Sequence, residues 1–267
     1  MSQALLRIRD VVRLYGGERR IFRAAAPVIR AVDGVSIDLD RGRTLGIVGE
    51  SGSGKSTLAR LMVGLLTVTS GEIELDGKSV AGLLREDRRA LYRRVQMVFQ
   101  DPLGSLNPRK TVREILEAPL KALCGMGPAA RRRRVEELVS LVQLRAEFVD
   151  RYPHEFSGGQ CQRIGIARAL AAEPELLVLD EPVSALDVSV QAQILALLAE
   201  LQSRMNLTYV FISHDLAVVE TIASEVAVMY LGKIVERGPC AQIFANPQND
   251  YTRLLLSSIP RNVAQFG

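Results

Sequence analysis

The nine residues GESGSGKST, from Gly49 to Thr57, have the composition of a loop that binds phosphate. They match the pattern G-x-x-x-x-G-K-[ST] and lie between a run that predicts a strand and a segment that predicts a helix. In such a loop, glycines let backbone N–H groups turn toward phosphate oxygens, and the helix N-terminus adds positive potential. We therefore predict that nucleotide phosphates contact Gly49, Glu50, Ser51, Gly52, Ser53, Gly54, Lys55, Ser56 and Thr57.

Two side chains of this loop and two carboxylates elsewhere form a predicted catalytic centre. Lys55 is long enough to reach the terminal phosphates, and the Ser56 hydroxyl is a suitable Mg²⁺ ligand. The run LLVLDE predicts a buried strand that has carboxylates only at its end. We predict that Asp180 holds Mg²⁺ and that Glu181 polarises the attacking water as a general base. The alternative is that this acidic pair only caps a helix.

Four apolar runs bounded by turn residues predict strands of a largely parallel sheet, because helix-period segments alternate with them. These runs are Thr44–Gly49, Arg94–Gln100, Leu176–Glu181 and Thr208–His214. Ligands of open parallel sheets bind beyond the carboxyl ends of the strands. We therefore expect one edge of the sheet to carry Gly49, Gln100, Asp180, Glu181 and His214.

The remaining segments divide around this core. LLRIRDVV, IRAVDGVSIDLD and GEIELDG predict further strands, the first two antiparallel and joined by a long arm. Between residues 101 and 172 strand signals disappear, and apolar residues recur at helical spacing. We predict a single domain over residues 1–267. Its parts are a nucleotide-binding core with an antiparallel β front (1–100 and 171–237), an inserted helical subdomain (101–170), and a C-terminal extension (238–267) with a hairpin exit and a short helix around YTRLLLSSI.

The stretch FSGGQCQR raises a separate question, because it places a glycine pair at a predicted helix start. Glycines there cost stability unless the backbone must approach something closely. The tetrad consists of Ser157, Gly158, Gly159 and Gln160, and it follows the phosphate loop by more than a hundred residues.

Five ordered motifs resemble those of the nucleotide-binding subunit of an ATP-binding cassette (ABC) transporter. They are the phosphate loop, FSGGQCQR, LLVLDEP, SALD and ISHD. The resemblance covers nearly the whole chain and implies an α/β fold with a P-loop NTPase (RecA-like) core, and ATP and Mg²⁺ as cofactors. It implies that Gln100 serves catalysis and the metal, that His214 contacts the γ-phosphate, and that Tyr15 stacks on adenine. His214 could instead only pack, and Tyr15, like Phe22 in the same arm, could serve only the hairpin.

The resemblance also explains the tetrad. In this family two subunits close head to tail, so each ATP lies between the phosphate loop of one and the signature tetrad of the other. A helix start with small residues can present N–H groups and a positive dipole end to a γ-phosphate. By resemblance, the residues that contact nucleotide near this interface are Ser157, Gly158, Gly159 and Gln160, together with Asp187 in the D-loop, SALD.

Two longer segments are similar to the oligopeptide, dipeptide and nickel importer branch. They are VFQDPLGSLNPRKTVREILEAPL and MYLGKIVERGPCAQIFANPQNDYTRLLLSSIP. The resemblance implies a second ATPase subunit, in a heterodimer or else a homodimer, two transmembrane permease subunits and, indirectly, an extracytoplasmic solute-binding protein. Peptide is the first expectation for the cargo, and nickel or another metal chelate is the alternative.

Composition limits the other classes of function. A net charge of +4, 5% aromatic residues and no tryptophan argue against a nucleic-acid partner. Three scattered cysteines indicate neither a disulfide framework nor a zinc site. We expect no signal peptide and no membrane span. The expected location is therefore peripheral, at the cytoplasmic face of the inner (plasma) membrane.

A non-transport cassette ATPase acting on DNA is the rival class. Such proteins usually carry a long coiled coil or zinc-binding cysteines between phosphate loop and signature, and this interval is compact and lacks both. An exporter is disfavoured because no membrane span is fused to the cassette.

Overall fold

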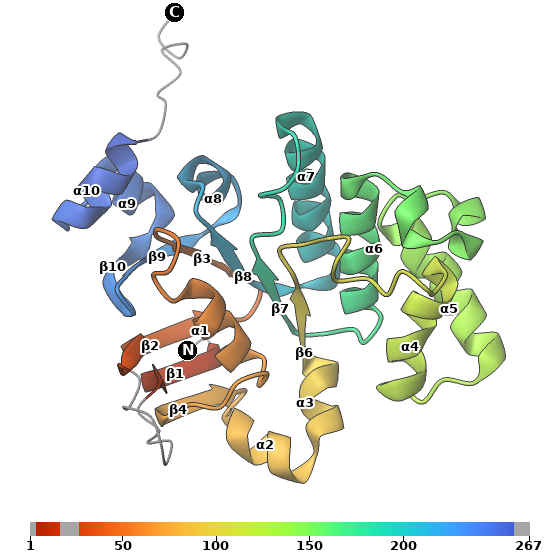
Figure 1. Ribbon diagram of the computed structural model, residues 1–267, viewed down its shortest axis with the longest axis horizontal. Helices are drawn as coiled ribbons and strands as arrows, with labels where there is room; N and C mark the ends of the chain where they lie inside the picture. The colour runs from red at the N-terminus through yellow and green to blue at the C-terminus, as the bar shows by residue number, and fades with distance from the viewer. Residues whose placement is uncertain (1–3, 17–26, 259–267) are drawn as a thin grey trace, which may run out of the picture.

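The computed structural model describes residues 4–16 and 27–258, whose strands form two sheets (Figure 1). A four-stranded antiparallel sheet has the order β2-β1-β4-β5, and a six-stranded sheet has the order β10-β9-β3-β8-β7-β6. In the second sheet only β10 runs antiparallel to its neighbour. The strands are β1 (Ala4–Tyr15), β2 (Ile29–Asp40), β3 (Thr44–Val48), β4 (Ser70–Leu75), β5 (Lys78–Ser79), β6 (Val95–Val98), β7 (Leu176–Asp180), β8 (Thr208–Ser213), β9 (Glu225–Tyr230) and β10 (Lys233–Pro239).

The central strands are buried on both faces, as their nearly uninterrupted apolar sequences predict. Every residue of β3, β7 and β8 is buried. Successive residues of β7 point into different cores: Leu177 and Leu179 pack with the large helices, whereas Leu176 and Val178 pack beneath the four-stranded sheet. The α/β fold expected from the four apolar runs is confirmed, and their strands are neighbours in one sheet.

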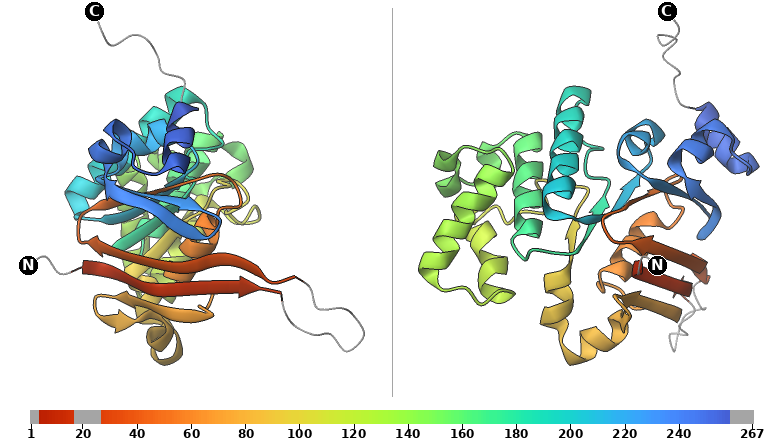
Figure 2. Two further views of the ribbon diagram at one scale, coloured as in Figure 1. Left: turned by 90° about the vertical axis from the view of Figure 1, so that its left-hand side faces the viewer. Right: turned by 180° about the vertical axis from the view of Figure 1, so that it is seen from behind.

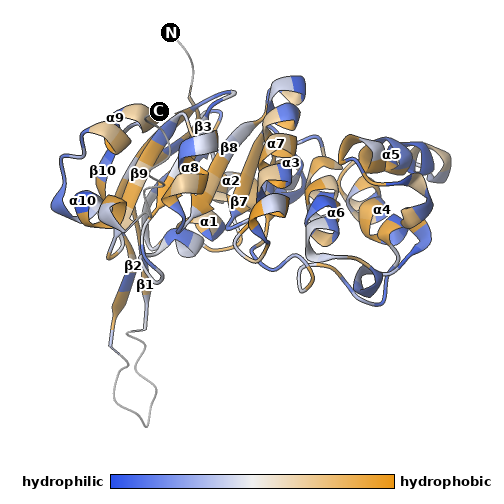
Figure 3. Cartoon of the chain, turned by 90° about the horizontal axis from the view of Figure 1, so that it is seen from above, coloured by the Kyte–Doolittle hydropathy of each residue, from blue (hydrophilic) through white to orange (hydrophobic). Residues whose placement is uncertain are grey.

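Helices cover both faces of the six-stranded sheet. Helix α1 lies between the two sheets, and α4, α5 and α6 form a group at one end of the molecule beside α7 (Figures 1 and 3). Within the described residues, no helix is long and apolar enough to cross a membrane. The helices are α1 (Lys55–Met62), α2 (Val80–Glu86), α3 (Arg88–Arg94), α4 (Val112–Ala122), α5 (Pro128–Leu141), α6 (Gly158–Leu170), α7 (Val188–Met205), α8 (Leu216–Ile222), α9 (Cys240–Ala245) and α10 (Asp250–Ser257), with short 3₁₀ turns at Ala146–Asp150 and Pro153–Glu155.

The sequence predicts a β-hairpin after residue 237, where the chain leaves the core, and this position is wrong. Strands β9 and β10 form the hairpin over residues 225–239, and α9 begins directly after it. The sequence EVAVMY has the same kind of short apolar run as the other core strands, and Val226 to Met229 are all buried. This run therefore extends the parallel sheet beyond β3.

Four charged side chains tie the two sheets together at the end away from the phosphate loop. Arg41 and Arg94 each bind both Asp76 and Glu175, with distances of 2.7 and 2.9 Å to Asp76. Hydrogen bonds from Arg41 and Arg94 lower the pKa of Asp76 and Glu175, respectively. The long β1–β2 ribbon, which is seen from the side in Figure 2, is thereby held against the core sheet.

Candidate active site

The phosphate loop is held by the turn that follows β9. Gly49 has φ = 150°, and a Cβ on it would lie 2.1 Å from the carbonyl oxygen of Met229. The N–H of Gly232 donates to the carbonyl of Ser53 at 2.9 Å. Glycine is therefore required at position 49 because another strand's backbone passes too close for any side chain. The conformation of the loop depends on β9 as well as on its own sequence.

Lys55 is a buried cation without an anionic partner in the described part of the chain. Lys55 is only 5% exposed. Its Nζ donates to the carbonyl oxygens of Gly49 and Glu50, both at 2.7 Å. Burial lowers the pKa of Lys55, and the negative charges of Glu181, Asp180 and Glu50 oppose this shift without reaching ion-pairing distance. Burying an ammonium group without a counterion is costly, so this position favours the binding of an anion such as phosphate.

Ser56 and Asp180 face each other across the junction of α1 and β7. The Ser56 hydroxyl donates to Oδ1 of Asp180 at 3.0 Å, and Asp180 is 4% exposed. Burial raises the pKa of Asp180, while the hydrogen bond from Ser56 opposes that shift. A hydroxyl and a carboxylate are the hard oxygen ligands that Mg²⁺ prefers, with phosphate and water completing its shell. The donor set therefore fits Mg²⁺, and the described residues contain no alternative cluster of three or more His, Cys, Asp or Glu for a metal.

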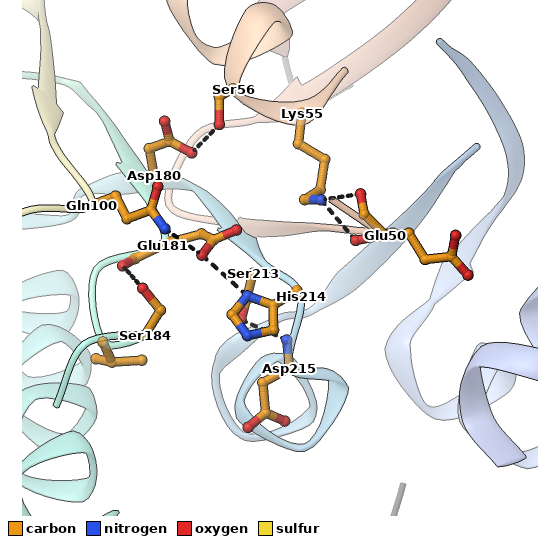
Figure 4. A network of polar contacts seen from close by, with 12 residues as sticks. Glu50, Lys55, Ser56, Gln100, Asp180, Glu181, Ser184, Ser213, His214 and Asp215 are labelled. Atoms are coloured by element: carbon orange, nitrogen blue, oxygen red, sulfur yellow. Dashed lines mark hydrogen bonds and ion pairs between the residues drawn. The ribbon is translucent and has the colours of Figure 1, made fainter. Parts of the chain in front are cut away.

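Gln100, Glu181 and His214 meet at a single carboxylate oxygen (Figure 4). Gln100 Nε2 donates to Oε2 of Glu181 at 3.0 Å, and Nδ1 of His214 lies 3.0 Å from the same oxygen. The two contacts come from the ends of β6 and β8, which flank β7 in the sheet. Because both neighbours use Oε2, the other carboxylate oxygen of Glu181 has no hydrogen bond within the described residues. A general base needs such an oxygen to accept a proton from water.

The backbone of Glu181 is fixed in an unusual conformation. Its φ is 49°, in the left-handed region that non-glycine residues rarely adopt. Its N–H donates to the carbonyl of Ile212 at 2.9 Å, and its own carbonyl accepts from the Ser184 hydroxyl at 3.1 Å. Strain of this kind persists only where the surrounding structure holds it, and it is concentrated at functional sites. It turns the chain out of β7 so that Asp180 and Glu181 face different partners.

The signature tetrad lies at the start of α6 and is separate from the phosphate loop. Within the described residues, no hydrogen bond or ion pair joins the two. Ser157 caps the helix: its N–H donates to Gln160 Oε1 at 3.0 Å, and its hydroxyl accepts from the Gln160 N–H at 3.4 Å. Ser157 and Gly158 are exposed. The first two residues of the tetrad are therefore open to solvent at the start of α6.

Gly159 has a packing reason that the sequence did not reveal. A Cβ on it would lie 2.5 Å from Cγ1 of Val190 in α7. A Cβ on Gly158 would be 3.3 Å from Leu186, which belongs to the predicted D-loop. The segment 184–187 therefore connects the Glu181 backbone to the tetrad, and its last residue, Asp187, is exposed at the N-cap of α7. Close packing against α7 therefore explains why one residue of the glycine pair, Gly159, has no side chain.

Tyr15 lies at the end of β1 with one ring face already covered. The Arg13 guanidinium carbon lies 4.9 Å from the centre of the Tyr15 ring, and the residue is half-buried. Phe22, the rival aromatic of the arm, lies outside the described residues. Stacking of Tyr15 on adenine stays a prediction.

The sequence does not predict one contact that α10 makes to the phosphate loop. The hydroxyl of Tyr251, in α10, accepts a hydrogen bond from the N–H of Glu50 at 3.1 Å. The motif YTRLLLSSI predicts a helix but contains no signal for where that helix docks.

Comparison with known families agrees with the fold and identifies the family. Residues 32–184 match the family model described as ABC transporter, and residues 235–266 match the model described as oligopeptide/dipeptide transporter, C-terminal region. The first match covers more than half of the 267 residues. The chain therefore belongs to the ATP-binding subunits of the ABC transporter family, which are ATPases coupled to transport.

Individual relatives within this family are named for the transport of oligopeptides and dipeptides. The chain is 50% identical to the oligopeptide transport ATP-binding protein AppF of Bacillus subtilis, over 97% of this chain and 79% of the relative. It is also 50% identical to the dipeptide transport ATP-binding protein DppF of Escherichia coli, over 98% and 78%. A dimeric structure of a post-hydrolysis state of the ATP-binding cassette MJ0796, bound to ADP and Pi, superposes with a TM-score of 0.76 at 29% identity, over 88% of this chain and 98% of that one.

We predict that Glu181→Gln lowers the rate of ATP hydrolysis by about 10²–10⁴-fold while ATP binding is retained, because an amide cannot accept the proton of the attacking water. Steady-state phosphate release and the binding of a fluorescent ATP analogue measure the two quantities. Glu220→Gln, at an exposed glutamate of α8, is the matched control. Wild-type turnover in Glu181→Gln would contradict the role of Glu181.

Proposed function

We propose that this chain is the ATP-hydrolysing subunit of an importer of oligopeptides or dipeptides. The observation that carries the cargo class is the match of residues 235–266 to the oligopeptide/dipeptide transporter C-terminal region, supported by half-identical relatives named for oligopeptide and dipeptide transport. The active-site geometry supports the ATPase activity, and the relatives support the cargo.

In the proposed reaction, the loop from Gly49 to Thr57 binds the phosphates of ATP, and Lys55 leaves the carbonyl oxygens of Gly49 and Glu50 for the terminal phosphates. Glu181 accepts a proton from the attacking water, and Gln100 and His214 hold its carboxylate in place. Mg²⁺, when bound at Ser56 and Asp180, neutralises charge on the phosphates. His214 is more exposed than Glu181, at 56% against 13% of the side chain, so it can also reach a phosphate from the solvent side.

We further propose that the chain works in a pair. Ser157 and Gly158 of its tetrad are exposed at the start of α6, as is expected if the tetrad contacts ATP on a second ATPase subunit. The structural relative MJ0796 is dimeric. A heterodimer with an unlike ATPase is the proposed arrangement, and a homodimer is the alternative. Closure of the pair around ATP and its release after hydrolysis would then supply the motion for transport.

The proposed membrane partners are two permease subunits, with a solute-binding protein acting through them. A hollow of about 310 Å³ that is open to solvent lies against β6. Phe99 lines it and directly precedes Gln100, so a permease helix seated there would act on the residue that holds Glu181. The lining also includes Val63, Leu65, Tyr92, Met97 and Leu123. The chain would then be peripheral, on the cytoplasmic face of the membrane.

For the pairing, we predict that Ser157→Arg reduces nucleotide trapping at the partner's phosphate loop and leaves this chain's own loop occupied, because an arginine side chain would block the approach of a γ-phosphate to α6. Photolabelling with azido-ATP, resolved by subunit, measures both sites. Ser140→Arg, at an exposed serine of α5, is the control. A loss confined to this chain's own loop would contradict the proposed arrangement.

For the cargo, we predict that the complete transporter in proteoliposomes takes up a labelled tripeptide when ATP is enclosed on the side of this chain, and that Lys55→Ala abolishes uptake. Uptake of Ni²⁺ and of a nickel chelate is measured in parallel. Transport of nickel without peptide would replace the cargo assignment with the alternative. DNA-stimulated ATP hydrolysis, with no transport of either cargo, would favour the non-transport class.

A further inference from the structure

The helix α10 docks onto the phosphate loop through a chain of defined contacts. Glu236 in β10 accepts the N–H groups of Gln248 and Asn249 at 2.7 and 3.1 Å. The side chain of Asn249 then caps α10 by accepting the N–H of Tyr251 at 2.9 Å. Tyr251 therefore extends from a helix that is fastened at its start to the core sheet through β10.

The hydroxyl of Tyr251 and the ammonium of Lys55 bind opposite ends of one peptide unit. The carbonyl oxygen of Gly49 accepts from Lys55 Nζ at 2.7 Å, and the N–H of Glu50, in the same peptide plane, donates to the Tyr251 hydroxyl at 3.1 Å. Rotation of this plane would break both hydrogen bonds. A peptide held at both ends has little freedom to turn its carbonyl away from Lys55.

The ring of Tyr251 is itself positioned by β9. Its centre lies 4.2 Å from that of Tyr230, and the two planes are inclined by 38°. Tyr230 follows Met229, whose carbonyl oxygen approaches Gly49 too closely for a side chain there. Burial raises the pKa of Tyr251 above its ordinary value, so its hydroxyl is protonated at neutral pH. The phosphate loop is thus bordered by β9 on one side and by α10 on the other.

We propose that Tyr251 is a positioning residue for nucleotide binding: its hydroxyl fixes the Gly49–Glu50 peptide and, with it, the shape of the phosphate loop that receives the phosphates beside Lys55. The C-terminal region would then serve the ATP site in addition to distinguishing this branch of transporters. The inference rests on the proposed role of Lys55 at the nucleotide phosphates. It assigns a task to a residue that lies 201 positions from its partner in the chain.

The test compares Tyr251→Phe with Tyr230→Phe in the full-length chain. Each change removes one hydroxyl and keeps the ring pair, and the Tyr230 hydroxyl makes no hydrogen bond within the described residues. We expect Tyr251→Phe to raise the KM for ATP by about three- to ten-fold, which is the effect of losing one hydrogen bond, with kcat within about two-fold of wild type. Hydrogen exchange of the peptide that contains Glu50 should become faster in Tyr251→Phe only.

The thermal midpoint separates positioning from simple destabilisation. A KM increase in Tyr251→Phe at unchanged thermal midpoint, absent from Tyr230→Phe, supports the inference. Equal KM values in wild type and Tyr251→Phe, or equal increases in both variants, would overturn it while leaving the proposed function intact. If wild-type protein bound no ATP, the proposed function would fail first, and the inference with it.

Discussion

The buried ammonium of Lys55 is the constraint around which the site is built. It lies among carbonyl oxygens, and no described carboxylate is close enough to form an ion pair with it. A cation in this situation is held by geometry at a cost in free energy, and that cost is recovered when an anion arrives. Gly49, the turn after β9 and the hydroxyl of Tyr251 all serve to keep the loop in the one shape that maintains this arrangement. The affinity for phosphate is therefore a property of the whole sheet edge.

The same edge separates the two chemical tasks that we propose for adjacent residues. Asp180 ends β7 beside the Ser56 hydroxyl, whereas Glu181, turned by its left-handed backbone, faces Gln100 and His214. Neighbouring parallel strands supply the partners because their carboxyl ends lie side by side. From Glu181 the chain continues through Ser184 to Leu186, which packs against Gly158. A continuous set of contacts thus connects the proposed base with the signature tetrad, which is proposed to serve the partner's ATP.

Much of this could be predicted from sequence because short apolar runs that end on polar residues determine both the strands and the position of the chemistry. The runs before Gly49 and Asp180 are unambiguous, and a largely parallel sheet is expected from such runs alternating with helices. Other features depend on tertiary contacts that leave no local signal. The run EVAVMY gives the same strand signal as the others but does not show that the turn after β9 holds the phosphate loop. Tyr251 reaches Glu50 only because α10 folds back, and Gly159 is small because of Val190. The sequence predicts that an external ligand approaches the tetrad, and the contact with Val190 shows that internal packing also requires Gly159.

The central claim is that Lys55 lacks a counterion until phosphate binds, and thermal unfolding of Lys55→Met with and without ATP and Mg²⁺ tests it most directly. Methionine has a similar length and carries no charge, so the account predicts a thermal midpoint at or above that of wild type without nucleotide. It also predicts that the variant lacks the stabilisation of about 2.7 kcal/mol that ATP at a hundred times its Kd gives wild type. A markedly lower midpoint of Lys55→Met without nucleotide would contradict the account, because it would show that the chain's own groups already satisfy the ammonium.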